Sequence, residues 1–138
     1  MGQHIREVMT PSPATVEAQS TVVEAARVMK QIDAGVVPVI ENGRLTGMVT
    51  DRDIAIRVVA EGKDPQSTTV GEVASKDLVT VDPQQDLDEA LRLMAQHKVR
   101  RLPVVEEDGR LVGVVAQADV ARKGDDKQTG QVVQEISE

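Results

Sequence analysis

The 138-residue sequence contains no phenylalanine, tryptophan, tyrosine or cysteine. Without aromatic rings, the core must be built from Val, Ile, Leu, Met and Ala. A pocket for a nucleotide base would have to hold it with aliphatic side chains and backbone groups, because stacking on aromatic side chains is excluded. The absence of cysteine excludes a disulfide framework, a thiol nucleophile and a thiolate metal site.

Positive charge and long apolar runs are also scarce. The formal net charge of −7 argues against an extended nucleic-acid partner, because phosphate backbones attract basic surfaces. The sequence has neither an apolar run long enough to span a membrane nor a signal-like N-terminus. We therefore expect a cytoplasmic protein without a membrane partner.

The two halves of the chain repeat each other. A shift of 65 residues places Glu7-Val8 on Glu72-Val73 and Pro38-Val39 on Pro103-Val104. One extra residue in a turn of the second copy makes the later shift 66, so that Asp53 corresponds to Asp119. This self-similarity indicates a duplicated supersecondary unit. Because a fragment of about 60 residues buries little surface alone, we expect the two copies to share a core.

Each copy has the pattern of a β-α-β-β-α unit. Thr21 with Glu24, and Asp86 with Glu89, form the capping-box pattern that begins a helix. Apolar residues follow at helical spacing, and we assign Met29 and Met94 to the core. The other expected elements are a β-prone segment at 14–17, strands at 36–40, 45–50, 102–105 and 111–116, turns with Gly43 and Gly109 at positive φ, and second helices at 51–61 and 117–123 that end at Gly62 and Gly124.

The motifs that carry a family resemblance lie around the two hairpins. They are Val37-Pro38-Val39 with Gly47-Met48-Val49-Thr50-Asp51-Arg52-Asp53, and Leu102-Pro103-Val104 with Gly113-Val114-Val115-Ala116-Gln117-Ala118-Asp119. Each resembles the motif of a CBS domain, and two in tandem resemble a CBS pair, or Bateman module. The division is then CBS domain 1 at 5–62, a linker at 63–69, CBS domain 2 at 70–123 and a polar tail at 124–138 that is either a short helix or disordered.

The resemblance implies an α/β (α+β) fold in which the two units pack sheet-to-sheet with pseudo-twofold symmetry and leave two clefts. Such pairs commonly bind AMP, ADP, ATP, S-adenosylmethionine or related adenosyl ligands. They also often form homodimers through their helices, and the apolar faces from Val22 to Met29 and from Leu87 to Met94 suit that role. We expect a homodimer that regulates a separate protein, whose identity the sequence does not reveal.

The first cleft carries the better chemistry. A carboxylate such as Asp53 can accept two hydrogen bonds from a ribose diol, while Thr50 and the helix N-terminus suit a phosphate. Arg100 and Arg101 would add charge-assisted contacts to that phosphate. The full set of candidates for this cleft is Thr50, Arg52, Asp53, Ser75, Val79, Val99, Arg100, Arg101 and Pro103.

Plainer interpretations compete for the same residues. Thr50 and Asp53 also match a simple helix cap, which stabilises any helix by about 1 kcal/mol, and capping can coexist with ligand contact. Arg100 and Arg101 can equally form a solvated basic rim at a helix end.

The second cleft departs from the family pattern. Its candidates are Thr10, Ala14, Ala34, Gly35, Pro38 and Asp119. Ala116 stands where the threonine belongs, and Gly35-Val36 replaces the arginine pair. Ribose recognition by Asp119 stays possible, but phosphate binding is disfavoured, so we expect one good site and one weak or empty site.

Other functional classes are less well supported. No nucleophile–base pair, paired acids or phosphate-binding loop is visible, so we expect no enzyme. A scaffold without a ligand is the main alternative, supported by the loss of the threonine at Ala116. A metal-responsive protein would have to use His4 or His97, the only histidines, which lack the close spacing of metal ligands.

Overall fold

The computed structural model describes residues 3–124, which fall into two compact units. Unit 2 is Ala14–Leu78, and unit 1 joins Met1–Pro13 to Val79–Glu138. The sequence repeats and the compact units therefore do not coincide: the segment before each repeat's first strand belongs to the unit that holds the other repeat's hairpin. Residues 125–138, the predicted tail, lie outside the described residues.

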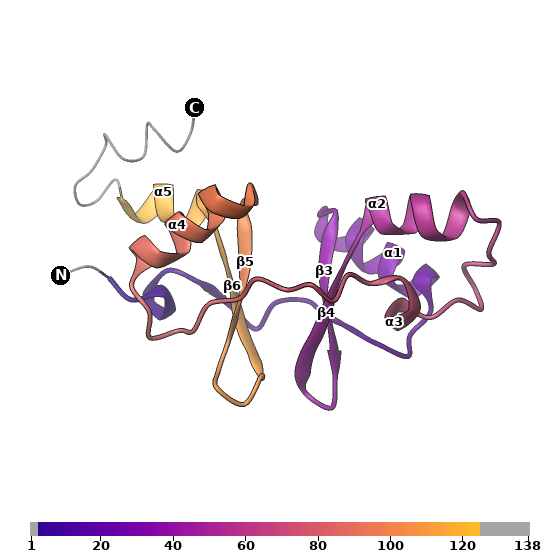
Figure 1. Cartoon of the computed structure of the whole chain (residues 1–138), viewed down its shortest axis with the longest axis horizontal. Helices are drawn as coiled ribbons and strands as arrows, with labels where there is room; N and C mark the ends of the chain where they lie inside the picture. The colour runs from indigo at the N-terminus through magenta and orange to yellow at the C-terminus, as the bar shows by residue number, and fades with distance from the viewer. Residues whose placement is uncertain (1–2, 125–138) are drawn as a thin grey trace. The chain divides into compact units, whose positions relative to one another are not determined.

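Unit 2 contains one three-stranded sheet in the order β2-β3-β4. Its strands are β2 (Val16–Glu17), β3 (Val36–Glu41) and β4 (Arg44–Thr50), with β2 parallel and β4 antiparallel to β3. Helix α1 (Val22–Ile32) precedes the hairpin, α2 (Asp51–Ile54) and a π-helical segment (Ala55–Val59) follow it, and α3 (Val70–Val73) closes the unit. Figure 1 shows α1 and α2 on one face of the β3–β4 hairpin.

Unit 1 repeats this arrangement with a sheet in the order β1-β6-β5. Its elements are a 3₁₀ helix (Ile5–Glu7), β1 (Thr10–Pro11), α4 (Leu87–His97), β5 (Arg101–Val105), β6 (Leu111–Ala116) and α5 (Gln117–Gly124). A parallel bridge between Val81 and Val104 occupies the place that β2 has in unit 2. The duplication and the mixed α+β class predicted from the sequence are confirmed.

A reciprocal exchange completes the two sheets. Thr10 pairs with Val114 of β6, and Ser75, which is 65 residues later, pairs with Met48 of β4. Glycine makes each approach possible. A Cβ on Gly47 would lie 2.9 Å from the backbone oxygen of Ser75, and one on Gly113 would lie 2.9 Å from that of Thr10.

The buried residues form two clusters rather than the single shared core expected from the sequence. The cluster of unit 2 includes Val70 and Val73 beside residues of the first repeat. The cluster of unit 1 includes Ile5 and Val8 beside residues of the second repeat. Each repeat therefore supplies apolar side chains that complete the core around the other repeat's hairpin, and this exchange stands in for a common core.

Most local predictions agree with the structure. Gly43 and Gly109 have φ of +79° and +89°, as their turns require, and Met29 and Met94 are buried. Thr21 caps α1 by accepting the N–H of Glu24. Asp86 is the N-cap residue of α4, as predicted, but its side chain makes no cap hydrogen bond.

The exchanged segment takes part in the start of α4, where the Asp86 cap was predicted. The backbone carbonyl of Gln3 accepts the N–H of Leu87 at 2.9 Å. The carbonyl of Thr68 does the same for Val22 at the start of α1. These long-range partners satisfy helix-end donors that would otherwise need local caps.

Candidate functional site

The N-terminus of α2 holds Thr50 and Asp53 in a complete capping box. The hydroxyl oxygen of Thr50 accepts the N–H of Asp53 at 3.0 Å. Asp53 Oδ2 accepts the N–H of Thr50 at 2.9 Å. The cap interpretation is therefore realised. It fixes Asp53 through one carboxylate oxygen and leaves Oδ1 as the oxygen that can accept further hydrogen bonds.

Arg57 lies one helical turn beyond Asp53. Its Nε is 4.0 Å from Asp53 Oδ1, and its Nη1 donates a hydrogen bond of 3.1 Å to the backbone oxygen of Val73. The side chain of Asp53 is 15% exposed and that of Arg57 is 52% exposed. Arg57 thus joins the start of α2 to the segment exchanged into unit 2, a contact that the sequence pattern did not indicate.

The other first-cleft candidates in unit 2 are Arg52 and Ser75. Arg52 is next to Asp53 in α2, and Ser75 pairs with Met48 of β4. Ser75 and Met48 exchange backbone hydrogen bonds of 2.9 and 3.0 Å, which places Ser75 beside β4 two residues before Thr50. Arg52 lies on the exposed side of α2. Unit 2 therefore holds four of the predicted residues around one helix start.

The other five first-cleft candidates belong to unit 1. Pro103 is buried in β5, and its backbone oxygen accepts the N–H of Val81. The exposed Arg100 accepts the N–H of Gln117 through its backbone oxygen at 2.8 Å. Within residues 3–124, the guanidinium groups of Arg100 and Arg101 have no ion-pair partner. Val79 is half-buried, and Val99 is 40% exposed.

The second-cleft candidates are also divided between the units. Unit 1 contains Thr10 and the buried Asp119, whose Oδ2 accepts the N–H of Ala116 at 3.2 Å. This is one half of the capping box, because Ala116 has no hydroxyl to return the second bond. Unit 2 contains the remaining candidates, Ala14, Ala34, Gly35 and Pro38.

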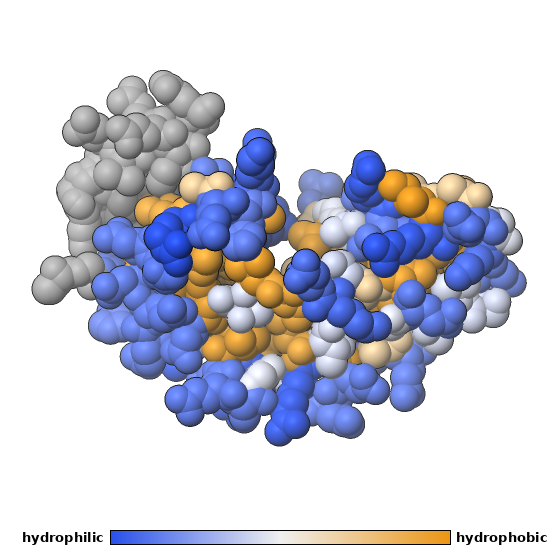
Figure 2. Space-filling model, viewed as in Figure 1, coloured by the Kyte–Doolittle hydropathy of each residue, from blue (hydrophilic) through white to orange (hydrophobic). Residues whose placement is uncertain are grey.

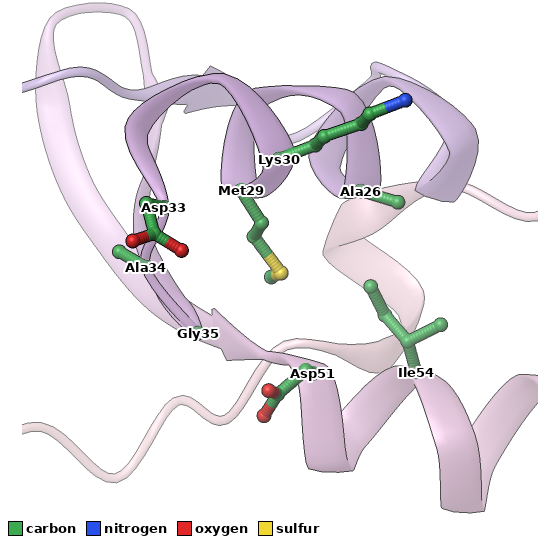
Figure 3. A pocket seen from close by; sticks show the side chains of 8 residues that line it. All are labelled: Ala26, Met29, Lys30, Asp33, Ala34, Gly35, Asp51 and Ile54. Carbon is green, nitrogen blue, oxygen red and sulfur yellow. The ribbon is translucent and has the colours of Figure 1, made fainter.

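A pocket of about 450 Å³ lies within unit 2, between the end of α1 and the start of α2. Met29 points into it and Ile54 lines it, while Asp33 and Asp51 extend from opposite sides (Figure 3). The pocket also includes Ala34 and Gly35 of the second cleft. Its volume suits a small molecule, but two carboxylates at its edge repel phosphate.

Metal ligation and membrane insertion are two further functional classes. Among residues 3–124, no group of three or more His, Asp or Glu side chains could hold a metal ion. His4 Nδ1 lies 3.9 Å from Glu7 Oε2. Over the same residues, no helix has the length and apolar character needed to cross a lipid bilayer.

Comparison with known proteins identifies the class of this duplicated fold. The family model for the CBS domain matches residues 5–60 and again residues 70–126. The CBS domain-containing protein YhcV of Bacillus subtilis is 50% identical over 117 residues, which are 85% of this chain and 82% of YhcV. The chain therefore belongs to the CBS-domain family and carries two such domains in tandem.

Two solved structures resemble the fold closely. Hypoxic Response Protein I with two coordinated zinc ions has a TM-score of 0.79 and 40% identity, over 87% of this chain and 98% of that one. CBSX2 in complex with AMP has a TM-score of 0.79 and 26% identity, over 91% of this chain and 98% of that one. CBS pairs are regulatory ligand-binding modules, so regulation by a bound ligand is the function class that the family defines.

Proposed function

We propose that this CBS pair is a non-catalytic sensor that binds an adenine nucleotide or another adenosyl ligand through Thr50 and Asp53. The geometry at the start of α2 supports the proposal most directly. The capping box holds Asp53 by one oxygen, while Oδ1 is available to accept hydrogen bonds from a ribose diol. The AMP bound to CBSX2, a relative at 26% identity, supports the same ligand class.

The proposal assigns the phosphate to Arg52, Arg100 and Arg101. All three side chains are exposed, and arginine favours phosphate because its guanidinium can donate two parallel hydrogen bonds. AMP, ADP, ATP and S-adenosylmethionine all carry the ribose that Asp53 would contact. The number and charge of the phosphates would then separate them through the arginines.

Ligand binding would act by shifting the balance between two arrangements of the protein, which a cytoplasmic partner protein would read. A homodimer is part of this proposal. The helix faces that the sequence suggests for dimer contact are occupied, because Val22, Ala25 and Met29 are buried in the core of unit 2. A second copy would have to contact other apolar groups, such as Ile56 and Val59, which are 45% and 69% exposed; hydrophobic atoms are visible along the helix that α2 begins (Figure 2).

Calorimetric titration of the purified protein with AMP, ADP, ATP and S-adenosylmethionine tests the proposal. Because the chain has no aromatic residues, residual absorbance near the nucleotide maximum would reveal ligand carried through purification. We expect Asp53→Asn to weaken binding by at least about tenfold, the equivalent of one hydrogen bond to a charged group. Asparagine keeps an oxygen that can cap Thr50, so the helix start is preserved.

Asp51→Asn is the matched control, because it removes the same charge from the same helical turn and should leave the affinity nearly unchanged. If the stripped wild-type protein is folded and binds none of these ligands, the scaffold function becomes the better one and Thr50 and Asp53 are only a helix cap.

A zinc-responsive function is the second candidate, because Hypoxic Response Protein I, at 40% identity, holds two zinc ions. The donors in this chain would be His4 and His97 with carboxylates, since cysteine is absent. Titration with zinc, compared between the wild type and the His4→Ala and His97→Ala variants, tests this function. Tight binding that either variant abolishes would favour it over nucleotide sensing.

A further inference from the structure

Arg57 is a charged residue that belongs neither to the capping box of Thr50 and Asp53 nor to the arginines assigned to the phosphate. It lies inside the π-helical segment Ala55–Val59, directly after α2. Helical irregularities of this kind are frequent at functional sites. Its guanidinium combines a hydrogen bond to the backbone oxygen of Val73 with an approach to Asp53, so its position is set by one partner and its charge acts on the other.

The two distances differ in what they allow. At 3.1 Å, the contact with Val73 is a hydrogen bond. At 4.0 Å, the contact with Asp53 Oδ1 is electrostatic only. The guanidinium therefore attracts the Oδ1 end of the carboxylate without using the lone pairs that a ligand hydroxyl would need. With Oδ2 held by the N–H of Thr50, both ends of the carboxylate are oriented.

The pair contributes little to stability. An ion pair at this separation, with one partner 52% exposed, adds between nothing and about 1 kcal/mol. A role in orienting the Asp53 carboxylate explains the arrangement better than a role in folding. The sequence of the second repeat has Lys123 at the equivalent position, and a lysine cannot present two directed donors in a fixed plane.

We propose that Arg57 is a positioning residue that sets the ribose selectivity of the Asp53 site, an inference that rests on the proposed nucleotide-binding function. Arg57 orients Asp53 so that its free oxygen meets both hydroxyls of a ribose. Without Arg57, the carboxylate can rotate away from that orientation. The site then no longer binds a ligand with a complete ribose diol more tightly than one with a single hydroxyl. Base and phosphate contacts are unaffected.

The test compares AMP with 2′-deoxy-AMP and 3′-deoxy-AMP by calorimetry, in the wild type and in Arg57→Gln. We expect the wild type to prefer AMP by about tenfold or more over each deoxy form, the value of one hydrogen bond to a charged group. In Arg57→Gln, we expect this preference to fall to about twofold or less, while the affinity for the deoxy forms changes little. Arg57→Lys should keep part of the preference, because the positive charge remains.

Arg27→Gln is the matched control. Arg27 makes a comparable exposed ion pair, with 3.9 Å between its Nη1 and Glu24 Oε1 in α1, and its loss should leave the selectivity unchanged. Thermal unfolding of each variant checks that the fold is intact.

Three results separate the inference from the proposed function. If Arg57→Gln weakens AMP and both deoxy forms equally, Arg57 acts only on general stability or charge, and the inference is wrong. If the selectivity of the wild type is lost in Asp53→Asn but unchanged in Arg57→Gln, the nucleotide site stands and the inference alone fails. If the stripped and folded wild type binds none of AMP, ADP, ATP and S-adenosylmethionine, the proposed function and the inference fail together.

Discussion

At the scale of single residues, the glycines of the second hairpin strands bear directly on how closely the exchanged segments can pack. Gly47 packs closely against the backbone oxygen of Ser75, and the equivalent Gly113 packs closely against the backbone oxygen of Thr10. In both places an added Cβ would lie 2.9 Å from a backbone oxygen, which cannot move aside as a side chain can, and at Gly113 the side-chain sulfur of Met9 is closer still at 2.6 Å. These glycines therefore serve packing, whereas Gly43 and Gly109 serve turns with positive φ.

We predict that Gly47→Ala lowers the free energy of unfolding by about 1–3 kcal/mol, the usual cost of overpacking. The new Cβ would lie 2.9 Å from the oxygen of Ser75 and 3.2 Å from Cβ of Ala74. Gly35→Ala is the control, because its closest contact is the carboxylate end of Asp51, which can rotate away. Urea unfolding measures both variants, and equal effects would contradict the backbone explanation.

A second residue-scale prediction concerns Glu72 at the start of α3. Hydrogen bonds from the backbone N–H and hydroxyl of Thr69 lower the pKa of the Glu72 carboxyl below its ordinary value. A lowered pKa in the folded state means that the stabilisation is present above the ordinary pKa of about 4.3 and is lost as the pH falls towards the folded value.

Glu72→Gln should therefore be less stable than the wild type near neutral pH, and the difference should shrink as the pH falls below the ordinary glutamate pKa towards the lowered pKa of the folded state. A series of urea midpoints from neutral to acidic pH measures the effect. Glu61→Gln, an exposed change of the same charge, should show no such convergence. A difference that persists in acid would mean that the charge of Glu72 is not the cause.

At the scale of elements, what the sequence predicted was local. The turns at Gly43 and Gly109 and the periodicity of α1 and α4 contain their own signals, because the residues that determine them are close in sequence. The β1–β6 pairing has no such signal, since Thr10 and Val114 are far apart in the chain. Only the repeat could have suggested it, by making Thr10 and Ser75 equivalent.

The same reasoning explains the candidate site. Thr50 and Asp53 were predictable because a capping box is a pattern of four consecutive residues, and the structure forms it. Their contact with a ligand stays a prediction. The bond from Arg57 to Val73 was not predictable, because it depends on where an exchanged segment packs. The hydrogen bond from Leu87 to the distant Gln3 is similar, since no local pattern indicates it.

At the scale of the whole molecule, the exchange predicts which unit responds to a substitution. Ile5 and Val70 are equivalent residues of the two repeats, and both have no exposed surface. Ile5 completes the core of unit 1 and Val70 that of unit 2. A mutation in either segment should therefore weaken the hairpin of the other repeat.

We predict that Ile5→Ala destabilises the protein by about 2–4 kcal/mol, and that Val70→Ala has a smaller effect because fewer methyl groups are lost. Hydrogen exchange should accelerate in β5 and β6 for Ile5→Ala, and in β3 and β4 for Val70→Ala. Ile32→Ala, at a side chain 44% exposed, is the control. Acceleration confined to each mutated residue's own repeat would contradict the assignment of the two cores.

The exchange of segments also determines what happens when the chain is divided. A cut in the polar stretch between Gly62 and Thr68 would separate the repeats but leave neither fragment with a complete unit, since each would carry apolar residues that belong to the other fragment's core. We therefore expect the two fragments to stay associated after such a cut. Each repeat therefore completes the core of the other. A single repeat of this kind could bury its core only by pairing with a second copy of itself.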